Sequence, residues 1–425
     1  MSIINGIDVS SLTDEQVLFF IRIRGRESYF KSVYSKKFLS LFSSLRKFRC
    51  ISEYKKDADV RIDLTSVNRD WLTHDEYNEL ARTVNIDDVI QRCRGLRNIS
   101  YTEARKLIYR AYLFFSSFYL QHTELRVIVM GAVDNYVMDM MQRIGLKHDI
   151  AFLGVTDSFM SPEYKLLSIR GELTKYLSPT EDEISKVYDT LRNRLISPSL
   201  PNKRRAVRSV AYDICSYIYR FTFRYIIMFK IRGDLAYEYR FAPHLHKCNS
   251  LEKVLSTRLL KAIKDVKVTA TSKLAYIPLH YYPEATTDYW INDQYHVDYM
   301  TSLRDTIRLL RKLGYSPIIK EHPAFYMARE KTVYSNLIED GAIVLEPFIA
   351  TKDIFELIDV VVVWNGSTGI EALIHGKPVL KVTNSYYGDG IIPDLSEQLA
   401  HPLQPTVEIA RNVIKTILST SFKTT

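Results

Sequence analysis

Apolar residues recur along the chain with two different spacings, and the order of these patterns predicts an α/β protein. In the first half, short apolar runs predict strands at 16–23, 57–64, 125–130, 150–154 and 164–169. Helical spacing predicts helices at 30–45, 75–121, 135–144, 181–195 and 251–266. Strands that alternate with helices are typical of βαβ units, so we expect a parallel sheet.

The second half repeats this alternation more clearly. Strands are predicted at 275–279, 317–320, 342–346, 360–364 and 379–382, and helices at 297–313, 354–358, 368–375 and 405–418. A chain of 425 residues is too long for one ordinary domain of about 100–200 residues. We therefore predict two doubly wound, Rossmann-like domains, at 1–255 and 256–425.

Composition and charge narrow the classes of partner. The chain has 58 Lys and Arg against 49 Asp and Glu, a net charge of +9, which favours phosphates, acidic glycans or anionic lipid headgroups. Nucleic acid is not expected, because no helix-turn-helix, RRM or zinc-finger pattern is found. The four cysteines have no CxxC spacing, and the first residues lack the pattern of a secretory signal, so we expect a cytoplasmic protein without a zinc site.

A basic and aromatic stretch at 217–231 contains the longest apolar run. Arg220, Arg224 and Lys230 interrupt it, and it is shorter than the ~20 apolar residues that cross a bilayer. Four basic residues at 203–208 precede it. The stretch either lies on an anionic membrane surface, at the inner face of the cytoplasmic membrane, or forms a buried helix whose arginines pair within the protein.

Ligands of open parallel sheets bind beyond the carboxyl ends of the strands, and the loop after 360–364 has suitable residues. In Asn365-Gly366-Ser367-Thr368, glycine lets the backbone approach a phosphate, and free amides and hydroxyls can bind it. Glu371, about one turn into the next helix, can accept both hydroxyls of a ribose. The alternative is an ordinary capped helix.

Two further loops at strand ends carry polar side chains. Lys320 and His322 can donate to an anionic phosphate, and a protonated His322 can also protonate a leaving phosphate. In the proline-rich loop 278–287, His280, Glu284 and Thr286 can bind sugar hydroxyls or a carboxylate. A structural histidine and a turn with exposed polar groups are the alternatives.

The segments PLHYYPEATT, IIKEHP and NGSTGIEALIHGKPVLKV, in this order and spacing, resemble the capsule polysaccharide biosynthesis family. That family includes retaining transferases of Kdo and related ulosonic acids. The resemblance covers roughly residues 270–390. It implies a GT-B fold, in which two Rossmann-like domains face a cleft. The donor nucleotide is then expected on the C-terminal domain and the acceptor on the N-terminal one, with no metal or other cofactor required.

The resemblance also implies roles for single residues. Lys320 and His322 would contact the donor phosphate, Ser367 and Thr368 would hold it, and Glu371 would bind the ribose. Pro347 and Phe348, which follow Glu346, would border the base. The chain departs from the commoner pattern at Asn365 and Ser367-Thr368, where Thr-Gly-Thr is usual, and at Ile370, where Trp is frequent.

Sugar transfer also needs a base for the acceptor hydroxyl, or a nucleophile. Candidates in N-terminal loops are Glu27, Asp134 and Asp157, with Glu172 after the next strand. The arginines of the same loops could bind an acidic acceptor or the donor carboxylate; they are Arg24, Arg26 and Arg170. Each of these residues could equally be a helix cap or a structural ion pair.

The sequence thus predicts a glycosyltransferase of capsule or lipopolysaccharide synthesis. Its donor would be a CMP-activated ulosonic acid, either Kdo or a nonulosonic acid, and its acceptor a glycan or glycolipid. One alternative is a GT-B relative such as a UDP-sugar transferase, a UDP-N-acetylhexosamine 2-epimerase-like enzyme or a CDP-polyol phosphotransferase. Another is a non-catalytic assembly subunit docked on the membrane.

Overall fold

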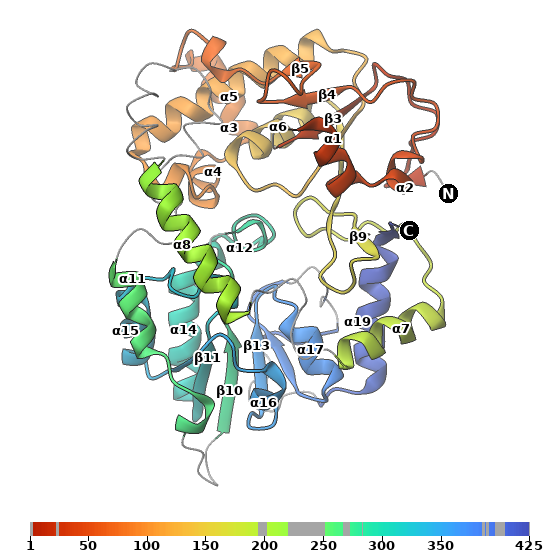
Figure 1. Cartoon of the computed structure of the whole chain (residues 1–425). Coiled ribbons are helices and arrows are strands. Elements are labelled where there is room, and N and C mark those ends of the chain that lie inside the picture. Colours follow the sequence, from red (N-terminus) through yellow and green to blue (C-terminus); the bar gives the residue numbers. More distant parts are fainter. Residues whose placement is uncertain are drawn as a thin grey trace. The chain divides into compact units, whose positions relative to one another are not determined.

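The computed structural model describes residues 3–22, 25–193, 202–219, 251–266, 273–282, 284–384, 387, 391–395 and 404–424. Within these ranges the chain forms two compact units (Figure 1): unit 1 contains 3–179 and 416–424, and unit 2 contains 180–219 and 251–415. These units divide the chain at 179/180 and 415/416, whereas the predicted domain boundary is at 255/256. Arg24, Pro283 and the predicted stretch from 220 to 231 lie outside the described residues.

Unit 1 is built on a five-stranded parallel sheet. Its strands are β3 (Val17–Ile21), β4 (Cys50–Ser52), β5 (Val60–Arg61), β6 (Val127–Met130) and β7 (Ala151–Gly154), in the order β5-β4-β3-β6-β7. Runs such as VLFFI in β3 and VIVM in β6 are wholly buried, as expected for strands covered on both faces. The longer helices are α3 (His74–Thr83), α4 (Ile86–Arg92), α5 (Tyr101–Gln121) and α6 (Tyr136–Lys147).

Two predictions for unit 1 are wrong in detail. In place of the helix expected at 30–45 there are two short helices, η1 (Phe30–Tyr34) and α2 (Lys36–Leu39), which follow α1 (Arg26–Tyr29). Ser35 has φ 59° and caps α2 with its side chain, which interrupts the helix. The strand expected at 164–169 is β9 (Tyr164–Leu166), which lies in a separate antiparallel sheet between β8 (Thr156–Asp157) and β15 (Ser421–Lys423).

Unit 2 contains the second parallel sheet. Its strands are β10 (Lys273–Pro278), β11 (Tyr315–Lys320), β12 (Ile343–Leu345), β13 (Val360–Val363) and β14 (Val379–Lys381), in the order β12-β11-β10-β13-β14. The longer helices are α7 (Glu181–Arg192), α8 (Lys203–Tyr219), α14 (Tyr299–Lys312), α15 (Lys331–Glu339) and α19 (Val407–Ser419). The helix expected at 251–266 is α11 (Leu251–Leu255) followed by two 3-10 turns, Ser256–Leu259 and Ile263–Asp265.

The two sheets have the same connectivity. Numbered along the chain, each has the strand order 3-2-1-4-5, in which the connection reverses direction between the first and the fourth strand. This is the order of the Rossmann fold, and ligands bind at its switch point, beyond the carboxyl ends of those two strands. The predicted α/β fold class with two Rossmann-like units is therefore confirmed. The switch point lies between β3 and β6 in unit 1 and between β10 and β13 in unit 2.

Candidate functional site

The loop between β13 and α17 (Thr368–Ile374) lies at the switch point of unit 2 and is held by three hydrogen bonds. The amide N–H of Asn365 donates to Nε2 of His280 at 3.4 Å, and its side-chain Nδ2 donates to the carbonyl oxygen of Thr286 at 3.2 Å. The hydroxyl of Tyr387 donates to the carbonyl oxygen of Gly366 at 2.5 Å. The loop is thus tied to the segment that follows β10, the neighbouring strand.

Gly369 lets α17 pack closely on this loop. A Cβ atom at this position would lie 2.6 Å from the Tyr387 hydroxyl and 3.2 Å from Cγ2 of Val363. Any larger residue would therefore displace either the tyrosine that holds Gly366 or the strand itself. The second glycine of the motif thus serves packing. At the first, Gly366, a Cβ atom would lie 3.4 Å from Cε1 of His280, and its predicted approach to a phosphate is not tested.

Several polar groups of this loop are available to a ligand. Within the described residues, the amides of Gly366, Ser367 and Thr368 donate to no backbone carbonyl, and Ser367 makes no side-chain cap bond. Oδ1 of Asn365 is buried and has no hydrogen-bond partner in the described part of the chain. Buried polar atoms are nearly always hydrogen-bonded, so this oxygen marks a place where a further donor is expected.

His280 follows β10 and is a buried residue, with 6% of its surface exposed. Its ring packs edge-on against Tyr299 and Trp364, and Arg329 donates to its carbonyl oxygen at 2.7 Å. Burial, with a smaller contribution from the positive charge of Arg329, lowers the pKa of His280 to about 4. The imidazole is therefore neutral at pH 7 and positions Asn365. Its predicted contact with a sugar stays a prediction.

Glu284 and Thr286 lie in the same loop and bond to each other. The Thr286 hydroxyl donates to the Glu284 carboxylate, and Glu284 is the N-terminal cap of the short helix α12 (Ala285–Asp288). Both side chains are half-buried. Thr286 also supplies the carbonyl that holds Asn365. Their predicted contact with sugar hydroxyls is not tested by these bonds.

Lys320 ends β11 and links two strand ends. Its ammonium donates to the carbonyl oxygen of Ile349 at 3.0 Å and to the hydroxyl of Thr351 at 2.9 Å, both in the segment after β12. Burial lowers the pKa of Lys320 to about 8, and the negative charges of Glu371 and Asp353 oppose this shift in part. Lys320 and Glu371 are thus close enough to interact, and the predicted phosphate contact of Lys320 stays a prediction.

Glu321 is fully buried and organises the strand end, a role that the sequence did not reveal. Its carboxylate accepts from Nε and Nη2 of Arg329 at 2.5 and 3.2 Å, from the Tyr334 hydroxyl at 2.7 Å and from the amide of His322 at 2.5 Å. Arg329 has only 4% of its side chain exposed. Because Arg329 also binds the carbonyl of His280, this ion pair joins the segments that follow β10 and β11.

His322 is half-buried and begins a 3-10 turn, Pro323–Phe325. Its Nδ1 accepts a hydrogen bond from the amide of Ala324 at 3.2 Å. In the neutral ring the proton therefore lies on Nε2, which can donate to an anion. The ring contacts Tyr281, with centroids 5.6 Å apart.

Further along the sheet, Phe348 packs on Tyr326 with centroids 5.0 Å apart, and Pro347 is buried. Their predicted place beside a base is not tested.

The strand order brings the main candidate segments together at one edge. Because β10 lies between β11 and β13, and neighbouring strands are ~4.8 Å apart, the strands that precede His322 and Ser367 are about 10 Å apart.

The switch point of unit 1 holds a buried carboxylate. Asp134 follows β6, has 8% of its side chain exposed, and pairs with Arg22, which follows β3. Arg94 lies 3.9 Å from the same carboxylate. Nearby, burial raises the pKa of Tyr29 to about 12, with Arg22 opposing and Asp134 adding to the shift. Asp134 therefore lies at the switch point of unit 1, and its predicted catalytic role is not tested by these contacts.

The other predicted carboxylates have different surroundings. Glu27 is exposed on α1, and Asp157, 88% exposed, pairs with Lys165 in the antiparallel sheet. Glu172 accepts from the amides of Ile169 and Arg170 at 2.6 Å each, as in a turn cap. Glu27 lies in the segment that follows β3, whereas Asp157 and Glu172 lie in and after the antiparallel strands β8 and β9. Catalysis by any of the four carboxylates stays a prediction.

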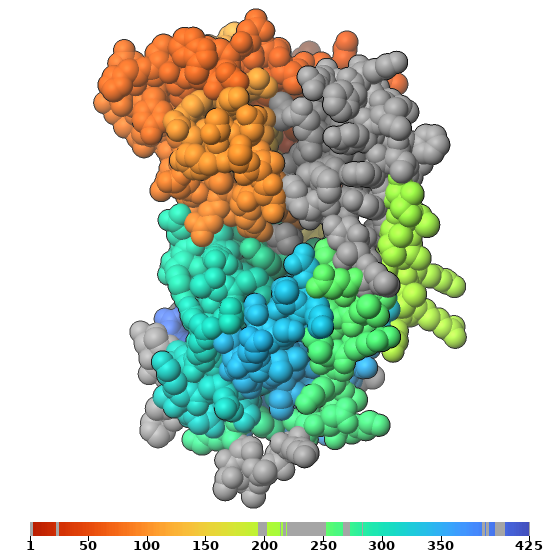
Figure 2. Space-filling view, turned by 90° about the vertical axis from the view of Figure 1, so that its left-hand side faces the viewer, coloured from red at the N-terminus to blue at the C-terminus, as the bar shows by residue number. Residues whose placement is uncertain are grey.

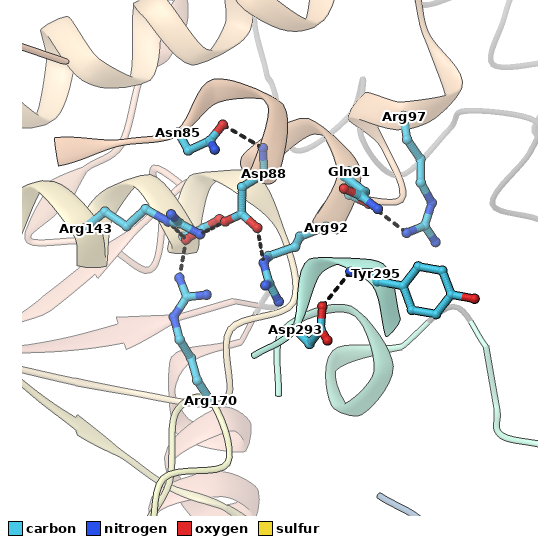
Figure 3. Close-up of polar contacts among 10 residues, drawn as sticks. Asn85, Asp88, Gln91, Arg92, Arg97, Arg143, Arg170, Asp293 and Tyr295 are labelled. Atoms are coloured by element: carbon cyan, nitrogen blue, oxygen red, sulfur yellow. Dashed lines mark hydrogen bonds and ion pairs between the residues drawn. The ribbon is translucent and has the colours of Figure 1, made fainter. Parts of the chain in front are cut away.

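The predicted arginines of unit 1 have structural partners. Arg170 bonds to Gln142 and to the buried carboxylate of Asp139. Asp139 also binds Arg143, which reaches Asp88, and Figure 3 shows Arg170, Arg143 and Asp88. Arg26 pairs with Asp59 at 3.1 Å. These pairs explain why charged side chains are half-buried there. Binding of an acidic ligand by Arg26 or Arg170 is not tested by them.

Two properties of the described residues concern metals and membranes. Over these ranges, no group of three or more His, Cys, Asp and Glu side chains is placed to hold a metal ion. None of the helices in the described part combines the length and the apolar character that crossing a bilayer requires.

Comparison with known proteins gave only distant structural likenesses. No family model and no curated protein matches this chain. The solved structures that it resembles include KpsC of Thermosulfurimonas dismutans, a β-Kdo 2,7-transferase, with 12% identity over 75% of this chain and 88% of that one, and a TM-score of 0.35. Another is the UDP-GlcNAc 2-epimerase of Methanocaldococcus jannaschii, with 8% identity over 95% and 92% and a TM-score of 0.27. These values are too low to assign an activity or a ligand to this chain.

Proposed function

We propose that this chain is a glycosyltransferase of surface polysaccharide synthesis that transfers an ulosonic acid from a CMP-activated donor to a glycan or glycolipid. One observation supports this most strongly. At the switch point of unit 2, the loop with Gly366, Ser367 and Thr368 offers unused amides and hydroxyls beside an unpartnered buried oxygen of Asn365. Ligands of Rossmann-like sheets bind at this point.

The residues at this edge suit each part of such a donor. Amides at 366–368 and the hydroxyls of Ser367 and Thr368 can bind the phosphate. When the bond between the sugar carbon and the phosphate oxygen breaks, Nε2–H of His322 can donate a hydrogen bond to that oxygen and so stabilise its negative charge. Glu371, which is close to Lys320, can accept the ribose hydroxyls. No metal is required for these steps in the proposal, so transfer is expected to persist in EDTA.

Asp134 in unit 1 is the carboxylate that we propose for the acceptor side. It either accepts the proton of the acceptor hydroxyl or attacks the sugar as a nucleophile. Arg22 pairs with this carboxylate and can hold it in place. Asp134→Asn should remove transfer, whereas Asp157→Asn and Glu27→Gln, at exposed positions, should retain it. Equal losses in the three variants would contradict the choice of Asp134.

Nucleotide binding tests the donor class without knowledge of the acceptor. The melting temperature of the protein should rise with CMP and not with UDP or CDP at the same concentration, because only a ligand bound by the folded state stabilises it. A rise with UDP alone would favour the UDP-sugar alternative. No rise with any of the three nucleotides would contradict the proposal and favour an assembly subunit.

Two variants test the phosphate site. His322→Asn keeps a side chain that can cap the following turn but removes the imidazole proton. Ser367→Ala removes one hydroxyl. Both should abolish turnover of a CMP-sugar, while His375→Ala, at the other end of α17, should leave it unchanged. Turnover retained in both His322→Asn and Ser367→Ala would refute the phosphate assignment.

The proposed location is the cytoplasmic face of an anionic membrane, and helix α8 supports it. In Figure 2, α8 is drawn in yellow-green at the surface, with long side chains projecting from it. Val207, Ile214 and Ile218 are 42%, 36% and 55% exposed and lie on one side of the helix. Its first turns carry four exposed basic residues, which are Lys203, Arg204, Arg205 and Arg208.

Vesicle binding tests this location. The protein should sediment with phosphatidylserine-containing vesicles and not with phosphatidylcholine vesicles, and less so in high salt. Replacing Arg204, Arg205 and Arg208 with Glu should abolish sedimentation without changing CMP binding. Binding of the triple variant equal to that of the unaltered protein would rule out α8 as the contact.

A further inference from the structure

A chain of four hydrogen bonds links His322 to Asn365 across strand β10, which lies between β11 and β13. The amide of His322 donates to the Glu321 carboxylate at 2.5 Å, and Nη2 of Arg329 donates to the same oxygen at 3.2 Å. Nη2 also donates to the carbonyl oxygen of His280 at 2.7 Å, and the ring of His280 accepts from the amide of Asn365 at 3.4 Å. We call Glu321, Arg329 and His280 the strand-end network.

The strand-end network is enclosed by the protein. The side chains of Glu321 and Arg329 are 0% and 4% exposed, and His280 is 6% exposed. The guanidinium lies over the ring of Phe325, 4.5 Å from its centroid, and the hydroxyl of Tyr334 donates to the carboxylate at 2.7 Å. Charge-assisted hydrogen bonds in such a low-dielectric setting are strong and directional. The network therefore confines the backbone of His322 and of His280 to narrow positions.

Stability alone does not account for a charged pair at this place. Removing two charges from water is costly, and well-packed apolar residues of similar volume often give a protein that is equally or more stable. Apolar side chains, however, cannot accept from one backbone amide and donate to another backbone carbonyl. Glu321 and Arg329 together do both, at His322 and at His280. What the pair adds to an apolar core is thus the relative position of two loops.

These two loops carry the groups assigned to the phosphate. Nδ1 of His322 accepts from the amide of Ala324, which leaves the proton of the neutral ring on Nε2. Asn365 begins the loop whose amides at 366–368 donate to no backbone carbonyl within the described residues. A phosphate on those amides can accept from Nε2 only if the loops keep a fixed separation, because a hydrogen bond spans only about 2.7–3.2 Å.

We infer that the strand-end network is a positioning element, and that Glu321 and Arg329 are positioning residues of the transfer reaction. This inference rests on the proposed function for the identity of the ligand. In this role the two residues act through His322 and Asn365 and not on the ligand itself. Without them the phosphate amides remain, so transfer should slow while nucleotide affinity stays the same.

An apolar variant separates this role from a purely structural one. It combines Glu321→Leu, Arg329→Met and Tyr334→Phe, so that no charge or hydroxyl of these three residues is left without a partner. Its urea midpoint should be no lower than that of Ile307→Val, a control substitution in the buried core on α14. Its kcat for a CMP-sugar should fall about 100-fold, the effect of a misplacement of about 1 Å, with its affinity for CMP unchanged. Ile307→Val should keep its kcat.

Arg329→Lys provides a second variant in case the apolar variant does not fold. The lysine keeps a positive charge beside Glu321, so the buried carboxylate stays compensated. Its ammonium is a point charge on a flexible stem and cannot reproduce the planar fork that joins the carboxylate to the carbonyl of His280. We expect a similar loss in kcat. Full kcat in either variant, once folded, would overturn the inference.

Nuclear magnetic resonance with inorganic phosphate tests the positioning without catalysis. In the unaltered protein and in Ile307→Val, phosphate should shift the Nε2 resonance of His322, which His322→Asn assigns. In the apolar variant and in Arg329→Lys this shift should be lost. An equal shift in all four proteins, or none in the unaltered one, would overturn the inference. Failure of the proposed function is distinguishable, because CMP would then not raise the melting temperature while the phosphate shift of His322 persists.

Discussion

Glu321 provides the sharpest test of the structure of unit 2. In Glu321→Gln the side chain keeps its size, but the negative charge that compensates Arg329 is removed. Both groups are buried, with 0% and 4% of their side chains exposed. The four hydrogen bonds that Glu321 accepts, from Arg329, Tyr334 and His322, all come from N–H or O–H groups. The NH₂ group of a glutamine must therefore face at least one of these donors.

The expected cost follows from these contacts. Removing one partner of a buried ion pair destabilises a protein by about 3–5 kcal/mol, because the other charge stays buried without compensation. With its oxygen toward the His322 amide, the glutamine places its NH₂ toward the Tyr334 hydroxyl, which can rotate to accept, and toward Nε–H of Arg329, which cannot. One unfavourable contact therefore remains, and we expect a loss of about 4 kcal/mol in the free energy of unfolding of unit 2.

Urea unfolding followed by tryptophan fluorescence can measure this loss. In a Trp71→Phe background the remaining tryptophans, Trp290 and Trp364, are both in unit 2, so the signal reports that unit. Asp340→Asn is the matched control. Asp340 also pairs with two arginines, Arg304 and Arg308, but these are 33% and 47% exposed, so a loss of at most about 1 kcal/mol is expected.

The double variant separates burial of charge from loss of packing. Glu321→Gln combined with Arg329→Met removes both charges, so it should be more stable than Glu321→Gln alone. A loss in Glu321→Gln no larger than in Asp340→Asn would refute the buried pair. A double variant less stable than either single variant would show that the charges are not what couples the two residues.

Three other changes have defined outcomes. Gly154→Ala should lower the stability of unit 1 by about 3 kcal/mol or prevent its folding, because the new Cβ would lie 2.2 Å from the carbonyl oxygen of Ser168; circular dichroism melting measures it. Lys320 has a pKa of about 8 when folded and about 10.5 when unfolded, so its buried charge costs about 3 kcal/mol below pH 8 and less as the pH rises. Between pH 7 and 9.5, urea unfolding should show unit 2 gaining about 2 kcal/mol relative to Lys320→Met. His280, with a pKa of about 4 when folded and 6.5 when unfolded, should cause a loss of about 3 kcal/mol as the pH falls from 6.5 to 4, measured against His280→Gln.

Both sheets could be predicted from the sequence because their strands are buried on both faces. Continuous apolar runs as short as 127–130 and 360–363 are typical of strands that helices cover on both sides. Strand β4 was missed because Cys50–Ser52 ends in a polar residue and lies between Arg49 and Glu53, so no apolar run marks it. The prediction of one helix at 30–45 was wrong because the spacing of apolar residues carries no information about the backbone of Ser35. Its positive φ ends one helical turn and begins the next.

The candidate site was predictable in its location more than in its contacts. Strand ends could be read from the sequence, so the segments around His280, His322 and Ser367 were expected at one edge. Their individual bonds depend on partners distant in sequence, such as Arg329 for the carboxylate of Glu321 and Thr351 for Lys320. A lysine directed at a neighbouring loop and one directed at a ligand have the same sequence pattern, so only the fold separates the two.

Strand β15 (Ser421–Lys423) has a consequence for synthesis on the ribosome. It completes the antiparallel sheet of unit 1, and Phe422 packs on Phe38 with ring centroids 5.0 Å apart. Roughly 250 residues lie between β9 and β15, and ribosomes add about 5–20 residues per second. Strand β15 is therefore synthesised tens of seconds or less after β9. During that interval Phe38 lacks one of its neighbours, and nascent unit 1 exposes an apolar surface that chaperones could recognise.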